Sequence, residues 1–398
     1  MARPTTGPTV YAFDFSVNPT SAGWVHTPAN PGDRPKHSES EGWSIDRGGQ
    51  IESPAISVTA NPFQYYRLTF RSKASVQGYY AVFFRNAAGE LLVDDDYASI
   101  YPSADWIEND IVFRGREGAA SFTVSFIAPT LPQISDMAVA AVSVEDAAAV
   151  SDRLYATMPP VAAVPAADRW AKIPRTMERL AQGGPLRVVM LGDSIMNDTN
   201  NGLWDALVMR QYPKAEVHVI TSVRGATGCW YYQAPEQFKS YIVDRKPDLL
   251  MLGGISNGSR DGGDGLAAMQ SVIAGVKKQI GCEVLVLSGP MGNDWRSHGA
   301  DANAPLPVQS PLPYPEFHRS LRTVFTVFTQ AELLPYERIA ALAAEMGVEY
   351  FDMYGPWHRY LGASRMPWNW FHRDVVHAND RGKQVLARML EQYFAPKA

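Results

Sequence analysis

The chain has few cysteines for its length, which excludes two structural classes. Two cysteines among 398 residues, Cys229 and Cys282, can build neither a disulfide framework nor a cysteine-rich zinc site. Cys229 lies beyond the end of one expected strand, and Cys282 lies before the start of another. In a parallel sheet the two thiols would then lie at opposite edges, too far apart for a disulfide. We expect both cysteines to be free.

Long apolar runs and blocks of like charge are also missing. No segment approaches the ~18 apolar residues that span a bilayer, and the opening MARPTTGPTV lacks the charged-then-apolar pattern of a signal peptide. The formal net charge of −5 is spread along the chain, unlike the basic stripe of nucleic-acid binders. The sequence therefore predicts neither a membrane nor a nucleic-acid partner, and it leaves the oligomeric state open.

The first third of the chain has the sequence pattern of an all-β domain. Short alternating or aromatic-rich runs are separated by clusters of Gly, Asn, Asp and Pro, for example at Tyr65 to Phe70, Tyr79 to Phe84, Ile111 to Phe113 and Phe122 to Ile127. This pattern is typical of an antiparallel β-sandwich. We assign 1–148 to a jelly-roll sandwich domain. The Ala- and Pro-rich segment 149–185 is assigned to a linker with one helix from Pro174 to Ala181.

The rest of the chain, 186–398, alternates apolar strands with helical patterns. The expected strands are Arg187 to Leu191, Val217 to Thr221, Leu249 to Gly253, Val284 to Ser288 and Val348 to Met353. Helical periodicity marks Leu203 to Gln211, Leu266 to Ile280, Tyr336 to Met346 and Asn379 to Tyr393. This alternation predicts a three-layer α/β/α domain with a doubly wound parallel sheet. The long loop from Pro290 to about Pro335 is a candidate lid or substrate wall.

The most informative motif is VVMLGDSIMNDTNN, at 188–201, where an apolar strand stops at a serine. It places Ser194 at the carboxyl end of a buried strand, which is where open α/β sheets bind ligands. A serine hydroxyl is a weak nucleophile that needs a general base, and His377 has a suitable pKa near neutrality. Asp374 precedes His377 by three residues, so on one helical turn its carboxylate can orient the imidazole.

Donors for an oxyanion follow the next two strands. Attack of Ser194 on an ester carbonyl would create a negatively charged oxygen. The backbone N–H groups of Ser194 and Gly225 and the side-chain amide of Asn257 could stabilise it. Losing one such donor typically costs about 10²-fold in rate, so donors from three separate loops form a demanding pattern.

Taken in this order, Ser194, Gly225, Asn257 and His377 resemble the four blocks of the GDSL or SGNH hydrolase superfamily. The resemblance covers roughly 186–394. It implies an SGNH, flavodoxin-like fold, a Ser194–His377–Asp374 relay, the oxyanion hole described above, and no metal or cofactor. Two features matter for the comparison. The third block is one residue longer than usual between glycine and asparagine, and no Gly-x-Ser-x-Gly elbow surrounds the serine, which argues against an α/β-hydrolase.

Aromatic residues near these motifs suggest a carbohydrate substrate. Faces of aromatic rings suit stacking on sugars, and neighbouring polar groups supply directional hydrogen bonds. The candidate substrate-binding residues are Asp193, Trp230, Tyr231, Trp295, Arg296 and Trp370. Three arginines, Arg224, Arg296 and Arg373, could meet a uronic acid carboxylate. The front domain resembles a carbohydrate-binding module, although a sandwich that only packs against the hydrolase is an equal alternative.

The sequence therefore predicts a serine carbohydrate esterase that removes acyl groups, most simply acetyl, from a poly- or oligosaccharide. Three alternatives remain open. The same relay could serve a lipase, thioesterase or acyltransferase, and the same cleft could cleave glycosidic bonds with Asp193 or Asp198. A non-catalytic glycan-binding protein is the third. A polysaccharide substrate would favour a secreted or periplasmic protein, but the chain itself leaves the cytoplasm open.

Overall fold

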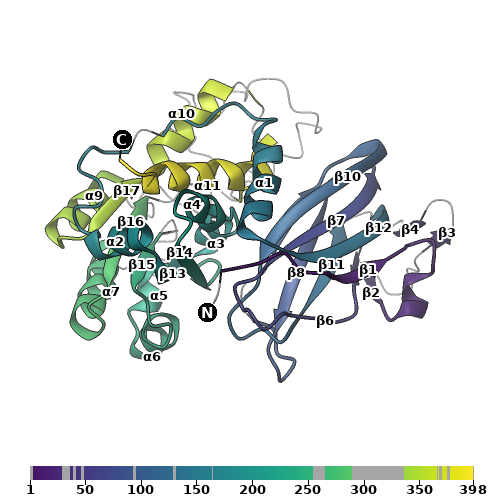
Figure 1. Ribbon diagram of the computed structural model, residues 1–398, viewed down its shortest axis with the longest axis horizontal. Helices are drawn as coiled ribbons and strands as arrows, with labels where there is room; N and C mark the ends of the chain where they lie inside the picture. Colours follow the sequence, from purple (N-terminus) through teal and green to yellow (C-terminus); the bar gives the residue numbers. More distant parts are fainter. Residues whose placement is uncertain are drawn as a thin grey trace. The chain divides into compact units, whose positions relative to one another are not determined.

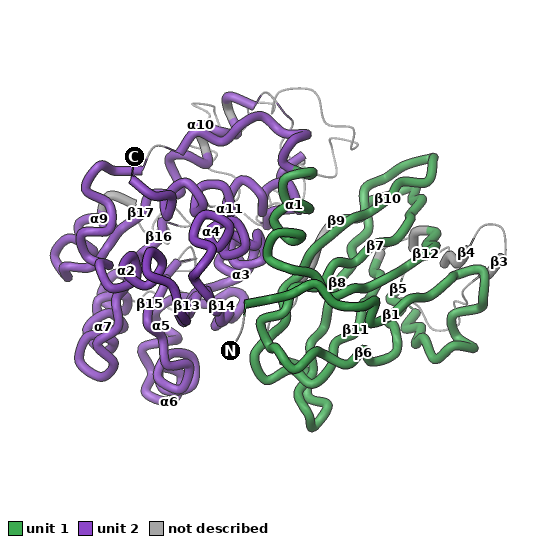
Figure 2. Tube along the Cα trace, viewed as in Figure 1, with its two compact units in different colours: residues 1–154 green, residues 155–398 purple. Residues whose placement is uncertain are grey.

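The computed structural model of the protein describes residues 3–28, 36–38, 42–45, 49–92, 96–128, 131–163, 165–253, 265–288, 336–364, 366, 370–373 and 377–397. The chain divides into two compact units, 1–154 and 155–398 (Figure 2). The predicted candidate lid, 290–335, lies outside the described residues.

Two antiparallel sheets form unit 1, which confirms the predicted β-sandwich. One sheet contains β1 (Thr9–Phe13), β3 (Lys36–Ser38), β4 (Gly42–Ile45), β7 (Tyr65–Ala74), β10 (Ser103–Arg114) and β12 (Leu131–Val142). The other contains β2 (Val25–Pro28), β5 (Gly49–Glu52), β6 (Ile56–Ser57), β8 (Gly78–Arg85), β9 (Asp96–Ile100) and β11 (Ser121–Ala128). A short 3₁₀ helix, Pro19–Ala22, and α1 (Val144–Tyr155) complete the described elements of this part of the chain.

Aromatic rings fill the space between the two sheets. Along β7, buried and more exposed side chains alternate, as expected for a strand with one face in the core. The ring centroids of Tyr66 and Phe122 lie 5.0 Å apart, and so do those of Phe70 and Phe126. Each pair joins β7 of one sheet to β11 of the other, so the core lies between the two sheets.

One carboxylate fastens α1 to the sandwich. Asp110 on β10 accepts hydrogen bonds of 2.6 Å from Arg67 on β7 and from Arg153 on α1. Burial acts to raise the pKa of Asp110, but the contacts with Arg67 and Arg153 outweigh burial and hold that pKa below its usual range. The helix begins at Val144, directly after β12, so it starts in the segment assigned to the sandwich and extends into the expected linker, 149–185.

Unit 2 contains a parallel sheet of five described strands, in the order β14-β13-β15-β16-β17. Their bounds are β13 (Gly184–Gly192), β14 (Ala215–Val223), β15 (Leu249–Leu252), β16 (Glu283–Ser288) and β17 (Glu349–Asp352). All five predicted strands are confirmed, and β15 and β16 are buried at every position, as expected for strands covered on both faces. The sheet order makes β13, in front of Ser194, the strand at which the winding reverses, a typical ligand-binding position.

Helices lie on both sides of this sheet, giving the predicted three layers (Figure 1). α3, α4 and α11 pack together on one side, whereas α5, α7 and α9 pack together on the other. The helices are α2 (Pro174–Gln182), α3 (Ser194–Asn200), α4 (Trp204–Gln211), α5 (Cys229–Tyr232), α6 (Pro235–Phe238), α7 (Gly265–Gln279), α9 (Tyr336–Glu345), α10 (Tyr354–Ser364) and α11 (Asp380–Phe394). A π-helix, Lys239–Val243, follows α6.

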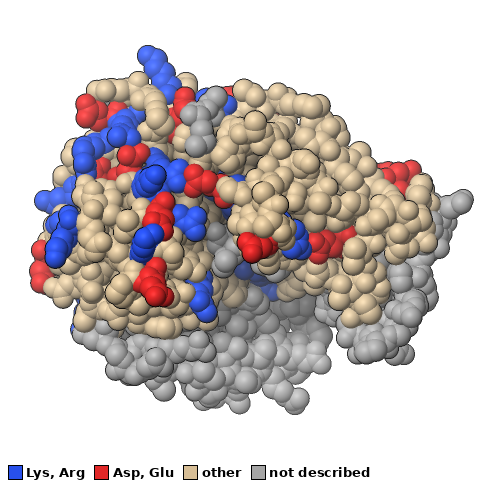
Figure 3. All heavy atoms as spheres, turned by 90° about the horizontal axis from the view of Figure 1, so that it is seen from below, with Lys and Arg blue, Asp and Glu red and all other residues tan. Residues whose placement is uncertain are grey.

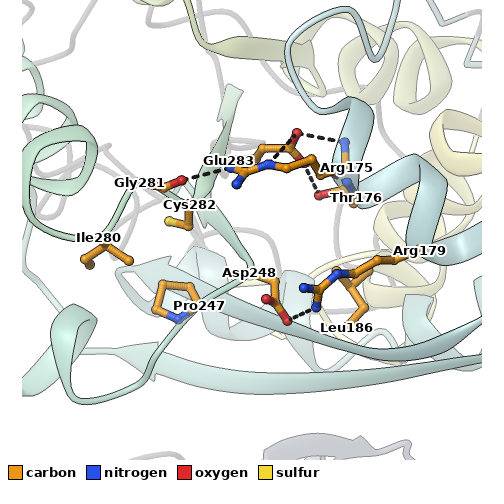
Figure 4. Close-up of a pocket in the computed structure, with 10 residues that line it drawn as sticks. All are labelled: Arg175, Thr176, Arg179, Leu186, Pro247, Asp248, Ile280, Gly281, Cys282 and Glu283. Carbon is orange, nitrogen blue, oxygen red and sulfur yellow. Dashed lines mark hydrogen bonds and ion pairs between the residues drawn. The ribbon is translucent and has the colours of Figure 1, made fainter.

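Residues 155–185, which the sequence suggested as part of a linker, pack within unit 2. Glu349 at the start of β17 accepts the Trp170 and Lys172 N–H groups at 2.7 and 2.9 Å. Glu283 at the start of β16 accepts the Arg175 and Thr176 N–H groups at 2.8 and 2.7 Å (Figure 4). Two buried carboxylates thus supply acceptors for backbone groups that a tether would leave to water. The expected helix from Pro174 is present as α2.

On the face drawn in Figure 3, Lys and Arg side chains lie among Asp and Glu side chains. Within the described ranges, no helix is both long and apolar enough to cross a membrane. Both cysteines are free thiols, as predicted.

Candidate active site

Ser194 is the first residue of α3, directly beyond the turn that ends β13. Asp193 is the N-cap of this helix, and its Oδ1 accepts the Ile195 N–H at 2.9 Å. The Asp193 side chain has no solvent exposure, whereas Ser194 is half-buried. This carboxylate caps the helix, and its predicted contact with a substrate stays a prediction. Asp193 orients the start of the helix that presents Ser194.

The turn before the serine is held by unusually close backbone contacts. A Cβ atom on Gly192 would lie 2.1 Å from the Gly253 carbonyl oxygen, so only glycine fits there. The Gly192 carbonyl accepts the Tyr232 hydroxyl at 2.6 Å and the Arg224 N–H at 3.1 Å. Tyr232 is fully buried, unlike its half-exposed neighbours Trp230 and Tyr231. It is a supporting residue that the sequence did not identify.

His377 meets Ser194 across the carboxyl edge of the sheet. Its Nε2 lies 2.8 Å from the Ser194 Oγ, within hydrogen-bonding distance. The histidine lies two residues before Asn379, the buried N-cap of α11, whose Oδ1 accepts the Arg381 and Gly382 N–H groups at 3.0 and 3.1 Å. The structure thus brings together the two residues that the sequence predicted as nucleophile and base. Asp374 lies outside the described residues.

Two further side chains that the sequence suggested for substrate contact form an ion pair with each other. Asp198 is 2% exposed and pairs with Arg373, whose Nη1 lies 2.7 Å from the Asp198 Oδ1. The glycosidase alternative named Asp193 and Asp198 as carboxylates that could participate, and the structure buries both side chains. Arg373 was a candidate partner for a uronic acid carboxylate, but its charge is already matched by Asp198.

Gly225 is exposed and lies after β14, close to the serine turn. A Cβ on Gly225 would meet nothing within 4 Å, and the positive φ in this loop belongs to Ala226, at 56°. In the part of the chain that the structure describes, neither the Ser194 N–H nor the Gly225 N–H donates to an acceptor. Donation from either group to an oxyanion stays a prediction. Asn257, the third predicted donor, lies outside the described residues.

The candidate substrate-binding aromatics are half-exposed where they are described. Trp230 and Tyr231 lie on α5, and the exposed Arg224 donates to the Tyr231 hydroxyl at 2.7 Å. Trp370 is also half-exposed, and the guanidinium of Arg381 lies 4.3 Å from its ring centroid. Trp295 and Arg296 lie outside the described ranges. Contact of these residues with a substrate stays a prediction.

A polar cavity lies at the opposite, amino-terminal edge of the sheet (Figure 4). Its lining includes the pairs Arg179–Asp248 and Arg175–Glu283, in which the arginines already face carboxylates. It is therefore separate from the Ser194–His377 pair. Among the described residues, no cluster of three or more His, Cys, Asp or Glu side chains could hold a metal ion.

Known proteins resemble this chain in fold. No protein-family model matches it, and no curated protein matches its sequence closely enough to count as a relative. A two-domain esterase (CEX) active on acetylated mannans is 14% identical, with 56% of this chain and 52% of that chain covered and a TM-score of 0.39. The match thus spans about half the length of that esterase, which has also been co-crystallised with mannopentaose.

Two shorter proteins are matched over nearly their whole length. Axe2, an acetyl-xylooligosaccharide esterase from Geobacillus stearothermophilus, is 14% identical, with 55% of this chain and 97% of that chain covered and a TM-score of 0.38. A protein from Parabacteroides merdae, proposed to be a GDSL-like lipase, is 11% identical, with 53% and 96% covered and a TM-score of 0.37. At these identities the similarity concerns the fold alone. The chain is structurally similar, over somewhat more than half its length, to SGNH/GDSL esterases, and it carries two antiparallel sheets besides.

Proposed function

We propose that the protein is a serine carbohydrate esterase that removes acyl groups, most simply acetyl, from a poly- or oligosaccharide. The observation that carries this proposal is the 2.8 Å approach of the His377 Nε2 to the Ser194 Oγ. This distance lets the imidazole take the hydroxyl proton as Ser194 attacks an ester carbonyl. This contact pairs a serine hydroxyl with a histidine directly beyond the carboxyl end of β13.

The reaction divides into two displacements. Ser194 Oγ bonds to the acyl carbon while His377 accepts the proton, and the developing oxyanion is stabilised by the Ser194 and Gly225 N–H groups with Asn257 as the third proposed donor. His377 then donates that proton to the leaving sugar oxygen, leaving an acyl-serine. Water, deprotonated by His377, attacks this intermediate and releases the carboxylic acid and free Ser194. Asp374 is proposed to orient the imidazole.

A carbohydrate substrate is supported by half-exposed aromatic residues on the segments that follow Gly225 and precede His377. Trp230 and Tyr231 are half-exposed on α5, which begins four residues after Gly225. Their rings can stack on sugar faces, and Arg224 beside them can donate to sugar hydroxyls. Trp370 adds a third half-exposed ring on the segment that leads to His377. The role of the β-sandwich in glycan binding, and a secreted or periplasmic location, belong to the same proposal.

The test is release of acetate by the purified full chain. Substrates are 4-nitrophenyl acetate and a panel of acetylated polysaccharides that starts with mannan and xylan. Ser194→Ala and His377→Ala should each lower kcat by about 10⁴- to 10⁶-fold, because the relay acts as a unit. The exposed Ser240, on the π-helix, provides the matched control Ser240→Ala, which should keep full activity.

The alternatives predict other outcomes in the same assays. A lipase would prefer long acyl esters to acetate, a thioesterase would prefer acyl thioesters, and an acyltransferase would give sugar esters when an acceptor alcohol is added. A glycan-binding protein would release nothing and would bind sugar equally well as Ser194→Ala. Absence of acetate release from every substrate, together with no labelling of Ser194 by a fluorophosphonate, would overturn the proposal.

A further inference from the structure

The loop that carries His377 is closed by its own backbone. The Asn379 N–H donates to the Phe371 carbonyl at 2.9 Å, and the Arg373 N–H donates to the His377 carbonyl at 3.0 Å. These bonds join residues 371–373 to residues 377–379, but they do not fix the distance between these residues and α3, where Ser194 lies. A second set of contacts is needed to hold the base against the nucleophile.

That second set comes from Asp198, four residues after Ser194 on the same helix. Its Oδ2 accepts the Ala378 N–H at 2.8 Å, and its Oδ1 accepts Nη1 of Arg373 at 2.7 Å. Arg373 also donates to the Ala378 carbonyl. A single carboxylate on the serine helix therefore holds the chain on both sides of His377.

We propose that Asp198 and Arg373 form a clamp that sets the position of His377 relative to Ser194, with Asp198 as a positioning residue. This inference rests on the proposed function, in which His377 is the base. The predicted role of Asp374 is to orient the imidazole ring. Asp198 instead restrains the chain before and after His377. One carboxylate is thus proposed to orient the ring, and the other to position the backbone that carries it.

Burial of the pair supports a geometric role. The side chains of Asp198 and Arg373 are 2% and 12% exposed. Desolvating two charges offsets most of their attraction, so a buried ion pair adds little stability compared with a hydrophobic pair of similar size. What the pair provides is direction, because two oxygens and one guanidinium admit few arrangements. A displacement of about 1 Å at a reacting group can cost 10²-fold in rate, which gives such a restraint catalytic value.

The chain offers a closely matched control at the other edge of the sheet. Asp248 also accepts one backbone N–H, from Arg187 at 2.9 Å, and one arginine, Arg179 at 2.8 Å (Figure 4). Asp198→Asn and Asp248→Asn therefore remove the same charge from the same kind of contact, and only the first touches the His377 loop. The two aspartates differ in exposure, which is 33% for the Asp248 side chain, so thermal unfolding is measured for each variant.

The experiment compares the full-length wild type with both variants and with the conservative Arg373→Lys. The readouts are the rate at which a fluorophosphonate labels Ser194, and kcat and KM on 4-nitrophenyl acetate. We expect Asp198→Asn to slow labelling and kcat by about 10- to 100-fold while KM stays within about threefold. Arg373→Lys keeps the positive charge but lacks the planar guanidinium group. Its loss of labelling rate and kcat should be smaller than that of Asp198→Asn. Asp248→Asn should match the wild type.

A second measurement separates positioning from a general structural role. In a His377→Ala background, Asp198→Asn should lower the residual rate no further, because the clamp acts through the histidine. An additive loss in that background, or a loss equal to that of Asp248→Asn, would overturn the clamp. If Asp198→Asn does not fold, full kcat in folded Arg373→Lys would overturn it as well. A wild type that is neither labelled nor active would overturn the proposed function, whereas equal labelling of wild type and Asp198→Asn would overturn only the clamp.

Discussion

Removal of one hydroxyl, in Tyr232→Phe, tests whether the turn before Ser194 must be held in place. The Tyr232 hydroxyl donates to the Gly192 carbonyl at 2.6 Å, two residues before the serine. The side chain is fully buried, so the substitution keeps its volume and its packing and deletes only the hydroxyl, which also accepts a long hydrogen bond of 3.4 Å from the Thr227 Oγ1. Any change in activity then reports on the position of the turn.

The size of the effect follows from what remains bonded after the substitution. The Gly192 carbonyl still accepts the Arg224 N–H at 3.1 Å, so it does not become an unsatisfied buried acceptor. The stability loss should therefore be that of one ordinary hydrogen bond, about 1 kcal/mol, rather than the larger cost of an orphaned group. That corresponds to roughly 2–4 °C in Tm for a unit of this size. A small shift of Ser194 should lower kcat about threefold to tenfold.

Tyr212→Phe is the matched control for this prediction. The Tyr212 hydroxyl also donates to a backbone carbonyl, that of Phe394, at 2.8 Å. Tyr212 lies just before β14, at the amino edge of the sheet and away from Ser194. The two variants should therefore lose similar stability in thermal unfolding. Only Tyr232→Phe should lose kcat on 4-nitrophenyl acetate, with KM little changed. Equal kcat values for the two variants would refute the reasoning.

Three further predictions concern stability and thiol chemistry. Glu349→Ala leaves three donors without their acceptor, so it should lower the unfolding free energy by about 2–4 kcal/mol, whereas the exposed Glu345→Ala should change it little. The lowered pKa of Asp110 stabilises the fold above its unfolded value of about 3.9, and this contribution is lost as pH falls through the folded pKa. Wild-type Tm should thus fall more steeply between about pH 5 and pH 3 than that of Asp110→Asn, and parallel curves would contradict this. Burial raises the pKa of Cys229 to about 12 and that of Cys282 to about 11, so at pH 8 a disulfide reagent should label both thiols much more slowly in the folded chain than after unfolding.

The parallel sheet and the ends of its strands could be predicted from the sequence because buried strands have a recognisable apolar pattern. Strands covered on both faces need continuous apolar runs, and each run stops where polar chemistry begins. The run before Gly192 is the clearest case. It predicted both the strand and the place of Ser194 at its carboxyl end, and β13 extends to Gly192. The facing position of His377 needed the four motifs taken together, since neither residue alone is distinctive.

Polar contacts between residues far apart in the sequence could not be predicted from such a pattern. Asp198 is separated from Arg373 by 175 residues, and Glu349 from Trp170 by 179. No local pattern predicts such pairs, because hydrophobic periodicity reports burial and not the partner of a buried charge. For this reason the sequence left Asp198 open as a carboxylate that could take part in glycoside cleavage. The Ala- and Pro-rich composition of 149–185 likewise indicated a tether, although its backbone N–H groups meet buried carboxylates.

Three buried polar residues near Ser194 bond to the backbone or to another buried side chain. Tyr232 fixes the turn before α3. Asn200, fully buried on α3, donates to the Thr221 hydroxyl on β14 at 2.7 Å and ties the helix to the sheet. Asp198 then ties the same helix to the His377 loop. Each contact restrains a different junction, between turn, sheet and loop, so no one of them can replace another. Altering two of these contacts should therefore disturb the geometry of the Ser194–His377 pair in two ways. A double variant such as Tyr232→Phe with Asp198→Asn should lose at least as much kcat as either single variant.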